Sequence, residues 1–274
     1  MPDTDVVASK AEKAVSSGRV AIVTGAGRGL GRAMALGLAR HGIAVVATAA
    51  RERAEIEGVA AEAPEHMVLP VLADVTREED AQRVVDATLE RFGRFDILVN
   101  NAGRGMKYVS ETFMTEPTRF WEVEPKTWRM VIDTNVNGPF LMARAAAPHM
   151  ARAGWGRIVN VSMSYSTMRR PGFSPYGPSK AALESETVIW AQDLRGTGVT
   201  VNALLPGGAT LTGMIPDALP EHARGTLLDP AIMVPPLLWL VSDEAGSVSG
   251  CRVTANQWDD ANPLAATEPA GWGG

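Results

Sequence analysis

The stretch VAIVTGAGRGLG, residues 20–31, decides how the chain begins to fold. It opens with a short run of aliphatic residues, which is typical of a buried strand in a parallel sheet. Glycines follow at positions 25, 27, 29 and 31, and residues 32–41 repeat apolar side chains at helical spacing. In such a strand–turn–helix unit, glycines let the backbone approach a pyrophosphate at the helix N-terminus. The stretch therefore predicts a dinucleotide-binding unit.

The same alternation of short aliphatic runs and helical segments continues along the chain. We expect seven strands, over residues 19–24, 43–49, 67–72, 95–99, 157–161, 199–205 and 252–254, the last at the edge of the sheet. This pattern predicts an α/β protein with a Rossmann-type, doubly wound, mainly parallel sheet flanked by helices. We assign residues 19–257 to this single domain, residues 1–18 to a flexible N-terminal extension and residues 258–274 to a C-terminal tail. The tail is expected to fray or to fold over a neighbouring subunit.

Composition and charge exclude several classes of function. The chain has 274 residues and a net charge of −5, and its basic residues form no block or stripe. Nucleic acid is therefore not an expected partner. No apolar run reaches the ~20 residues of a membrane span, so we expect no membrane association. Cys251 is the only cysteine, which excludes a disulfide framework, disfavours a metal site and suits a cytoplasmic location.

The end of the expected strand 43–49 indicates which dinucleotide is preferred. An acidic residue there holds the ribose 2′-hydroxyl of NAD, whereas an arginine accommodates the 2′-phosphate of NADP. Here Ala49 is followed by Ala50 and Arg51, and the first acid is Glu52. Arg51 and Arg28 can both face a phosphate. The sequence therefore favours NADP(H), with NAD(H) as the alternative.

Tyr176 and Lys180 lie four residues apart in a segment with a helical pattern, 176–195. Residues at this spacing share one helix face, so the phenol and the ammonium can reach one site. A phenol ordinarily titrates near ~10, and a nearby cation lowers its pKa and makes it usable as a general acid or base. The alternative is an ordinary amphipathic helix, and the other motifs decide between the two.

Four motifs occur in a fixed order, namely TGxxxGxG from Thr24 to Gly31, NNAG at residues 100–103, Asn135, and Tyr176 with Lys180. Together they resemble the short-chain dehydrogenase/reductase family over about residues 19–255. The resemblance implies hydride transfer between a nicotinamide ring and a carbonyl or carbinol carbon, with Tyr176 as the proton donor or acceptor. It also implies that Lys180 holds the nicotinamide ribose and lowers the pKa of Tyr176. Asn135, in a kinked helix, would support a proton relay to Lys180.

The same resemblance implies the contacts of the cofactor. Gly25, Gly29 and Gly31 would pass under the pyrophosphate, with Arg28 and Leu30 beside them. Asp74 would bond to the adenine amino group, with Val75 against the ring. The other expected contacts are Arg51, Tyr176 and Lys180, with Asn101, Ala102 and Gly103 on the adenosine-ribose side, and Pro206 and Gly207 with Thr210 or Thr212 at the carboxamide.

One position departs from the family pattern. Family members usually carry a serine thirteen residues before the tyrosine, where its hydroxyl holds the substrate oxygen, and here that position is Met163. Either Ser162 or Ser164 supplies the hydroxyl, or the site lacks it. We favour Ser164 because it would begin the loop after the strand, where alternation weakens. Without such a donor, turnover falls on the order of 10²–10³-fold.

Two long segments are expected to form the substrate side. Residues 104–127 are rich in aromatic side chains, including Tyr108, and residues 209–230 carry Met214 in a mobile flap. With Tyr108, Met163 and Met214 as expected contacts, the substrate should be a bulky, mainly apolar ketone or secondary alcohol. We expect a homotetramer or homodimer. A nucleotide-binding sensor, or a lyase or isomerase on the same scaffold, is the alternative function.

Overall fold

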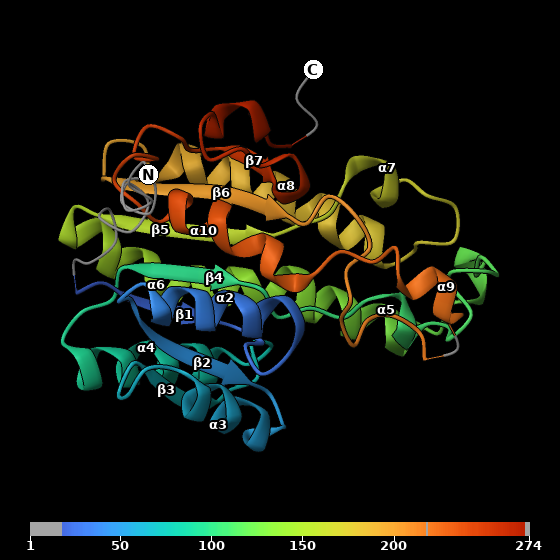
Figure 1. The fold of residues 1–274 in the computed structure, drawn as a ribbon, viewed down its shortest axis with the longest axis horizontal. Helices are drawn as coiled ribbons and strands as arrows, with labels where there is room; N and C mark the ends of the chain where they lie inside the picture. Colours follow the sequence, from blue (N-terminus) through green and yellow to red (C-terminus); the bar gives the residue numbers. More distant parts are fainter. Residues whose placement is uncertain (1–17, 218, 272–274) are drawn as a thin grey trace, which may run out of the picture.

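The computed structural model describes residues 18–217 and 219–271, and Figure 1 shows the arrangement of its helices and strands. The predicted N-terminal extension, apart from Gly18, lies outside the described residues. The centre is a single sheet with the strand order β3-β2-β1-β4-β5-β6-β7-β8. The strands are β1 Val20–Val23, β2 Ala44–Ala49, β3 Val68–Leu72, β4 Ile97–Asn100, β5 Gly156–Val161, β6 Val199–Leu205, β7 Cys251–Thr254 and β8 Thr267–Pro269.

The expected α/β fold with a doubly wound, mainly parallel sheet is confirmed, but the count of seven strands was one too few. The eighth strand, β8, comes from the predicted C-terminal tail and pairs antiparallel with β7, so β7 is not at the edge. Arg252 of β7 lies opposite Glu268 of β8. Three residues that end in a proline carry no alternation that a sequence pattern could detect.

Two layers of helices cover the sheet. The helices are α2 Gly29–Arg40, α3 Arg53–Glu62, α4 Glu78–Phe92, α5 Pro125–Ile132, α6 Gly138–Ala153, α7 Tyr165–Met168, α8 Tyr176–Asp193, α9 Glu221–Arg224 and α10 Val234–Leu240. On one face, α2, α3 and α10 pack on strand residues such as Val23 and Val45. On the other, α4 and α6 pack on Ile22 and Val46. Because neighbouring strand residues point to opposite faces and both faces are covered, the strands are mainly apolar.

The border strand at the opposite end of the sheet, β3, pairs with β2 and contains Pro70. Proline has no N–H, so this position gives the ladder no donor.

The helical segment that carries Asn135 is interrupted between α5 and α6 by a π-turn, η3 (Asp133–Asn137). Such a turn inserts an extra residue into the helical ladder and is common at functional sites. The kink expected in this segment is therefore a π-turn.

The ligand side of a parallel sheet lies beyond the carboxyl ends of its strands. In Figure 1 the short helices α5, α7 and α9 lie beyond the arrowheads of β4, β5 and β6. The predicted substrate-side segments, residues 104–127 and 209–230, contain α9 and the start of α5. The site is therefore built at this end of the sheet.

Candidate active site

The glycine-rich turn after β1 is tied to the end of β4 by one threonine and one asparagine. The Oγ1 of Thr24 accepts the backbone N–H groups of Asn101 and Ala102, each at 3.0 Å. The side-chain amide of Asn101 donates to the carbonyls of Thr24 and Gly25, at 2.8 and 3.0 Å. Asn101 thus holds the turn in place. Thr24 was not among the predicted site residues, although its position at a strand end was a usable signal.

The glycines of this turn are required by its geometry. Gly25 and Gly29 have φ angles of +62° and +54°, which other residues rarely adopt. A Cβ at Gly31 would lie 2.2 Å from the carbonyl oxygen of Gly25. Helix α2 then begins without a side-chain cap at Arg28 and without an acidic residue in its first turn. Its first N–H groups therefore remain available to an anion, and the residues present fit a pyrophosphate.

The expected 2′-phosphate region holds an acid that the sequence reading overlooked. Glu55 of α3 lies against Gly27, where a Cβ would be 2.7 Å from its own Cβ. Its Oε1 is 3.6 Å from Nη1 of Arg28. Arg51 is exposed at the end of β2. A carboxylate here competes with any phosphate for Arg28, so Glu55 works against the NADP(H) preference that Arg28 and Arg51 indicate.

The predicted adenine contacts follow β3. The Oδ1 of Asp74 accepts the N–H and the hydroxyl of Thr76, at 3.0 and 2.8 Å. The N–H of Asp74 donates to Asp80 at 2.9 Å. Val75 is buried, and its side chain packs against Gly138 at the start of α6. Asp74 and Val75 therefore shape the turn before α4.

The segment after β6 reaches the glycine-rich turn. Gly207, with φ of +87°, leaves no room for a Cβ, because the side chain of Asn256 would lie 2.0 Å away. Thr210 is buried, and its hydroxyl donates to the carbonyl of Gly208 at 3.2 Å. Thr212 instead lies against the glycine-rich turn, where a Cβ at Gly29 would be 3.1 Å from its methyl group. Of the two threonines that the sequence left open, Thr212 is the one at the turn.

The flap also contacts the other substrate-side segment. The Sδ of Met214 would lie 3.2 Å from a Cβ at Gly105, and its methyl group 3.7 Å from one at Gly103. Lys107 and Asp217 form an ion pair at 3.0 Å. Tyr108 is half exposed under the guanidinium of Arg104, 4.7 Å from its ring centroid. The flap is thus closed over the end of β4.

Tyr176, Lys180 and Asn135 are brought together from α8 and η3. Asn135 is fully buried and donates to the hydroxyl of Ser179 at 2.9 Å, which in turn donates to the carbonyl of Tyr176 at 2.7 Å. Asn135 also exchanges two hydrogen bonds with the backbone of Arg104. Lys180 donates from Nζ to the carbonyl of Val161 at 2.7 Å and lies 6.0 Å from the Tyr176 ring centroid. Ser179 and Arg104 are site residues that the sequence reading missed.

Burial sets the protonation of both titratable groups. It lowers the pKa of Lys180 to about 8, while the carboxylate of Glu184 acts in the opposite direction. It raises the pKa of Tyr176 to about 12, because a buried phenolate is poorly solvated. Burial therefore opposes the lowering of the Tyr176 pKa that the resemblance implied. The phenol is held in its neutral form, which is the form that can donate a proton.

Met163 lies in an apolar cluster beside the tyrosine. Four buried residues form this cluster, Met106, Met163, Met168 and Phe173, with Tyr176 packed against them. The hydroxyl of Ser164 is paired with those of Thr167 and Ser166 at the start of α7, at 2.8 and 3.3 Å. The hydroxyl of Ser162 is buried and forms no hydrogen bond with the described residues. The preference for Ser164 as the helper hydroxyl therefore receives no support from its contacts.

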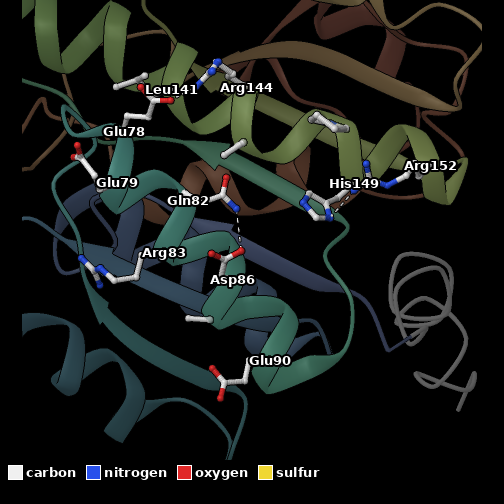
Figure 2. A pocket seen from close by; sticks show the side chains of 13 residues that line it. Glu78, Glu79, Gln82, Arg83, Asp86, Glu90, Leu141, Arg144, His149 and Arg152 are labelled. Carbon is white, nitrogen blue, oxygen red and sulfur yellow. Dashed lines mark hydrogen bonds and ion pairs between the residues drawn. The ribbon is translucent and has the colours of Figure 1, made fainter.

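The described residues line at least two hollows. One, of about 990 Å³, lies between α4 and α6 and is lined by charged side chains such as Glu78, Asp86 and Arg144 (Figure 2). Glu78 and Arg144 form an ion pair across it. The other, of about 610 Å³, is lined by residues 117–121 and by part of 168–178, including Met168 and Phe173 of the apolar cluster. It borders the substrate side, whereas the first does not.

Within residues 18–217 and 219–271, no group of three or more His, Cys, Asp or Glu side chains could hold a metal ion. No helix in these ranges is long and apolar enough to cross a membrane.

Comparison with known proteins identifies the class. The family described as "short chain dehydrogenase" matches residues 19–222. The chain therefore belongs to the short-chain dehydrogenase family, and it is an NAD(P)-dependent oxidoreductase by the standard of that family.

Individual relatives agree with this assignment. The 3-oxoacyl-[acyl-carrier-protein] reductase FabG of Thermotoga maritima is 32% identical over 243 residues, which cover 85% of this chain and 94% of that protein. Among solved structures, a 3-ketoacyl-(acyl-carrier-protein) reductase from Brucella melitensis complexed with NADH is 33% identical, with a TM-score of 0.74 and coverage of 85% and 94%. A putative NAD(P)-dependent gluconate 5-dehydrogenase from Beutenbergia cavernae with bound NADP is 31% identical, with a TM-score of 0.73 and coverage of 86% and 94%.

Proposed function

We propose that this chain interconverts ketones and secondary alcohols of mainly apolar character, with a preference for NADP(H). The observation that carries the proposal is the placement of Tyr176. Its ring packs on an apolar cluster, while its helix is anchored from behind by Ser179 and Asn135. A proton donor at an apolar surface suits a carbonyl oxygen whose substituents are hydrocarbon.

Each residue has a separate task in this proposal. A bound nicotinamide supplies or accepts the hydride. Tyr176, neutral at physiological pH, donates a proton to the substrate oxygen or takes one back. Lys180, with a pKa of about 8, is protonated in a large share of the molecules near pH 8. Its ammonium then offers N–H donors to ribose hydroxyls. Asn135 fixes both the end of β4, through Arg104, and the first turn of α8, through Ser179.

The cofactor would be held by the glycine-rich turn and by the N-terminus of α2, which has no side-chain cap. Gly25, Gly29 and Gly31 keep the backbone accessible, with Arg28 and Leu30 beside them. Thr212 lies at the same turn from the opposite side. The NADP(H) preference rests on Arg51 and Arg28. Glu55 pairs with Arg28 and so weakens the attraction of Arg28 for a phosphate.

The substrate side would be lined by Met163, Tyr108 and Met214. Met163 occupies the position where a hydroxyl would be expected, and it lies in the apolar cluster. Bulkier parts of a substrate have room in the hollow of about 610 Å³ next to Met168 and Phe173. We retain the homotetramer or homodimer and the cytoplasmic location as predictions from the sequence.

The test replaces the proposed acid. Nicotinamide absorbance is followed with a panel of ketones and alcohols, once with each cofactor, for the parent and for Tyr176→Phe. We expect the parent to turn over apolar ketones and Tyr176→Phe to lose at least ~10²-fold in kcat, because general acid catalysis typically contributes 10²–10⁴-fold. An unchanged melting temperature shows that the variant is folded. Equal turnover of the two proteins would contradict the oxidoreductase mechanism and favour the sensor, lyase or isomerase alternatives.

A further inference from the structure

Arg252 of β7 is a buried cation that no motif of the sequence explains. Its side chain is 2% exposed. Its Nη2 donates to the carbonyl of Met163 at 2.7 Å, and its Nε lies 3.5 Å from Oε1 of Glu184. Its Nη1 donates to Oε1 of Glu268 at 3.3 Å, and its guanidinium carbon lies 3.7 Å from the ring centroid of Tyr165. A buried guanidinium needs such partners, because an unpaired one is very costly.

Glu184 is the buried partner of this cation. It lies on α8 one turn after Lys180, and its side chain is fully buried. Its Oε2 accepts the N–H of Gly271 at 3.3 Å. The segment that follows β8 thus closes over Glu184, and Gly271 itself packs against Val188 of the same helix. The ion pair is covered by the C-terminal tail, which was expected to fray or to fold over a neighbouring subunit.

Both members of the pair reach the catalytic residues. Arg252 holds the backbone of Met163, whose side chain lies in the apolar cluster against Tyr176. Among the described residues, the groups that face Lys180 are the Tyr176 ring, the Val161 carbonyl and the Glu184 carboxylate. Those that face Glu184 are Arg252, Lys180 and the N–H of Gly271. Glu184 is therefore shared between the two buried cations.

We propose that Arg252 and Glu184 are positioning residues for catalysis, whose ion pair is covered by β8 and by the residues that follow it. Arg252 fixes the end of β5, so that Met163 stays beside the phenol of Tyr176. Glu184 favours the charged form of Lys180, against the burial that disfavours it. Arg252 forms an ion pair with the Glu184 carboxylate, which reduces the cost of burying that negative charge. The part of this inference that concerns turnover rests on the proposed function, whereas the part that concerns Lys180 does not.

The protonation of Lys180 can be measured without any activity. The chain has five lysines, Lys10, Lys13, Lys107, Lys126 and Lys180, so the NMR spectrum of protein with isotope-labelled lysine is simple. The Lys180 signal is assigned from its loss in Lys180→Arg. We expect it to titrate near pH 8 in the parent and at lower pH in Glu184→Gln, because the neighbouring negative charge is gone. Glu186→Gln, the same substitution on the same helix, serves as the control and should leave the Lys180 signal near its parent midpoint.

Kinetic measurements distinguish the effect of Arg252 on the position of Met163 from the effect of Glu184 on the charge of Lys180. With an active parent, Arg252→Met should lower kcat at least ~10-fold with a smaller change in the KM of the cofactor, because Met163 is no longer held. Arg252→Lys should recover part of that loss, since it keeps the charge. In Glu184→Gln, the alkaline limb of kcat/KM should move to lower pH together with the Lys180 titration. A merely structural role would leave that limb in place.

Each variant has an outcome that either supports or contradicts the positioning role of Arg252 and Glu184. If a single substitution prevents folding, the pair Glu184→Gln with Arg252→Met removes both charges, and replacing both members of a buried pair is far better tolerated than removing one. The Lys180 titration is then read in that double variant. A Lys180 midpoint equal to the parent value, or full kcat in both Arg252 variants, overturns the inference. Failure of the parent to reduce any ketone would instead count against the proposed function.

Discussion

The Met163 side chain places an apolar surface beside the phenol of Tyr176. A serine at this place would offer a hydrogen-bond donor to the substrate oxygen, whereas a thioether offers a soft apolar surface. The surrounding cluster of Met106, Met168 and Phe173 extends that surface. With Met163 in place of a serine, the protein gives up one hydrogen bond to the substrate oxygen and gains apolar surface for the rest of the substrate. A substrate should therefore be selected by its hydrocarbon part.

We expect Met163→Ser to raise kcat for small ketones by about 10-fold or more, as part of the 10²–10³-fold that such a donor supplies. The melting temperature should fall, because a large buried side chain is replaced by a small polar one. Met168→Ser, in the same cluster, is the matched control: it should lower the melting temperature without the gain in turnover. A gain in both variants would mean that looser packing, and not the new hydroxyl, is responsible.

Glu55 and Arg51 should control the choice of cofactor in opposite directions. Glu55→Gln frees Arg28 for a phosphate and should raise the ratio of kcat/KM for NADPH over NADH about 2–5-fold, the size of one exposed charge interaction. Arg51→Asp should lower the same ratio, because an acid repels a phosphate and accepts a ribose hydroxyl. Glu57→Gln, on the same helix and facing Arg53, should leave the ratio unchanged. An unchanged ratio in Arg51→Asp would show that Arg51 does not face the cofactor.

At the scale of elements, the π-turn η3 joins the segment after β4 to α8. Its central residue, Asn135, bonds to the backbone of Arg104 after β4 and to Ser179 in α8. A regular helix would carry one residue fewer through this segment and would turn Asn135 away from one of these partners. The irregular turn thus sets the distance between the end of β4 and α8.

We expect Asn135→Ala to lower the free energy of unfolding by about 2–4 kcal/mol, because it leaves buried partners of two elements unsatisfied. Turnover should fall as well, since the first turn of α8 is no longer held. Asn137→Ala, an exposed asparagine in the same π-turn that bonds to Asp133, should cost less than ~0.5 kcal/mol. Denaturant unfolding and ketone reduction are measured on both variants. Equal costs for the two would contradict a special role for Asn135.

At the scale of the whole molecule, stability should depend on pH through Glu186. Burial raises the pKa of this α8 carboxyl from 4.5 to about 7. The folded state therefore binds more protons than the unfolded state between these values, so stability is lost as pH rises through about 7. Glu186→Gln stays neutral and should melt roughly 2–6 °C above the parent at pH 8, with the difference vanishing near pH 4.5. Glu90→Gln, an exposed acid on α4, should show no such pH dependence. A constant difference across pH would rule out titration of Glu186 as the cause.

The sequence was sufficient for the parts of the molecule that local pattern controls. Seven strands were recognisable because each is a short aliphatic run, and the glycines were recognisable because their turn tolerates nothing else. Contacts between distant segments left no such pattern. Arg252 appeared to be an ordinary residue of an edge strand, since its partners Met163, Glu184 and Glu268 are remote in the chain. The pKa of Tyr176 could not be predicted for a related reason: spacing shows that a lysine is near, but burial depends on the packing of the whole domain.

The two borders of the sheet have a consequence for how copies of this protein can meet. At one border, Pro70 deprives β3 of a backbone donor, and at the other, β8 is only three residues long. An open strand with unpaired backbone groups invites lateral pairing and aggregation, and natural sheets block it with prolines and short strands. Continuation of the sheet from one molecule into the next is therefore disfavoured at both ends. Self-association of this protein should proceed through its helical surfaces, and loss of β8 should expose β7 to fibril-like contacts.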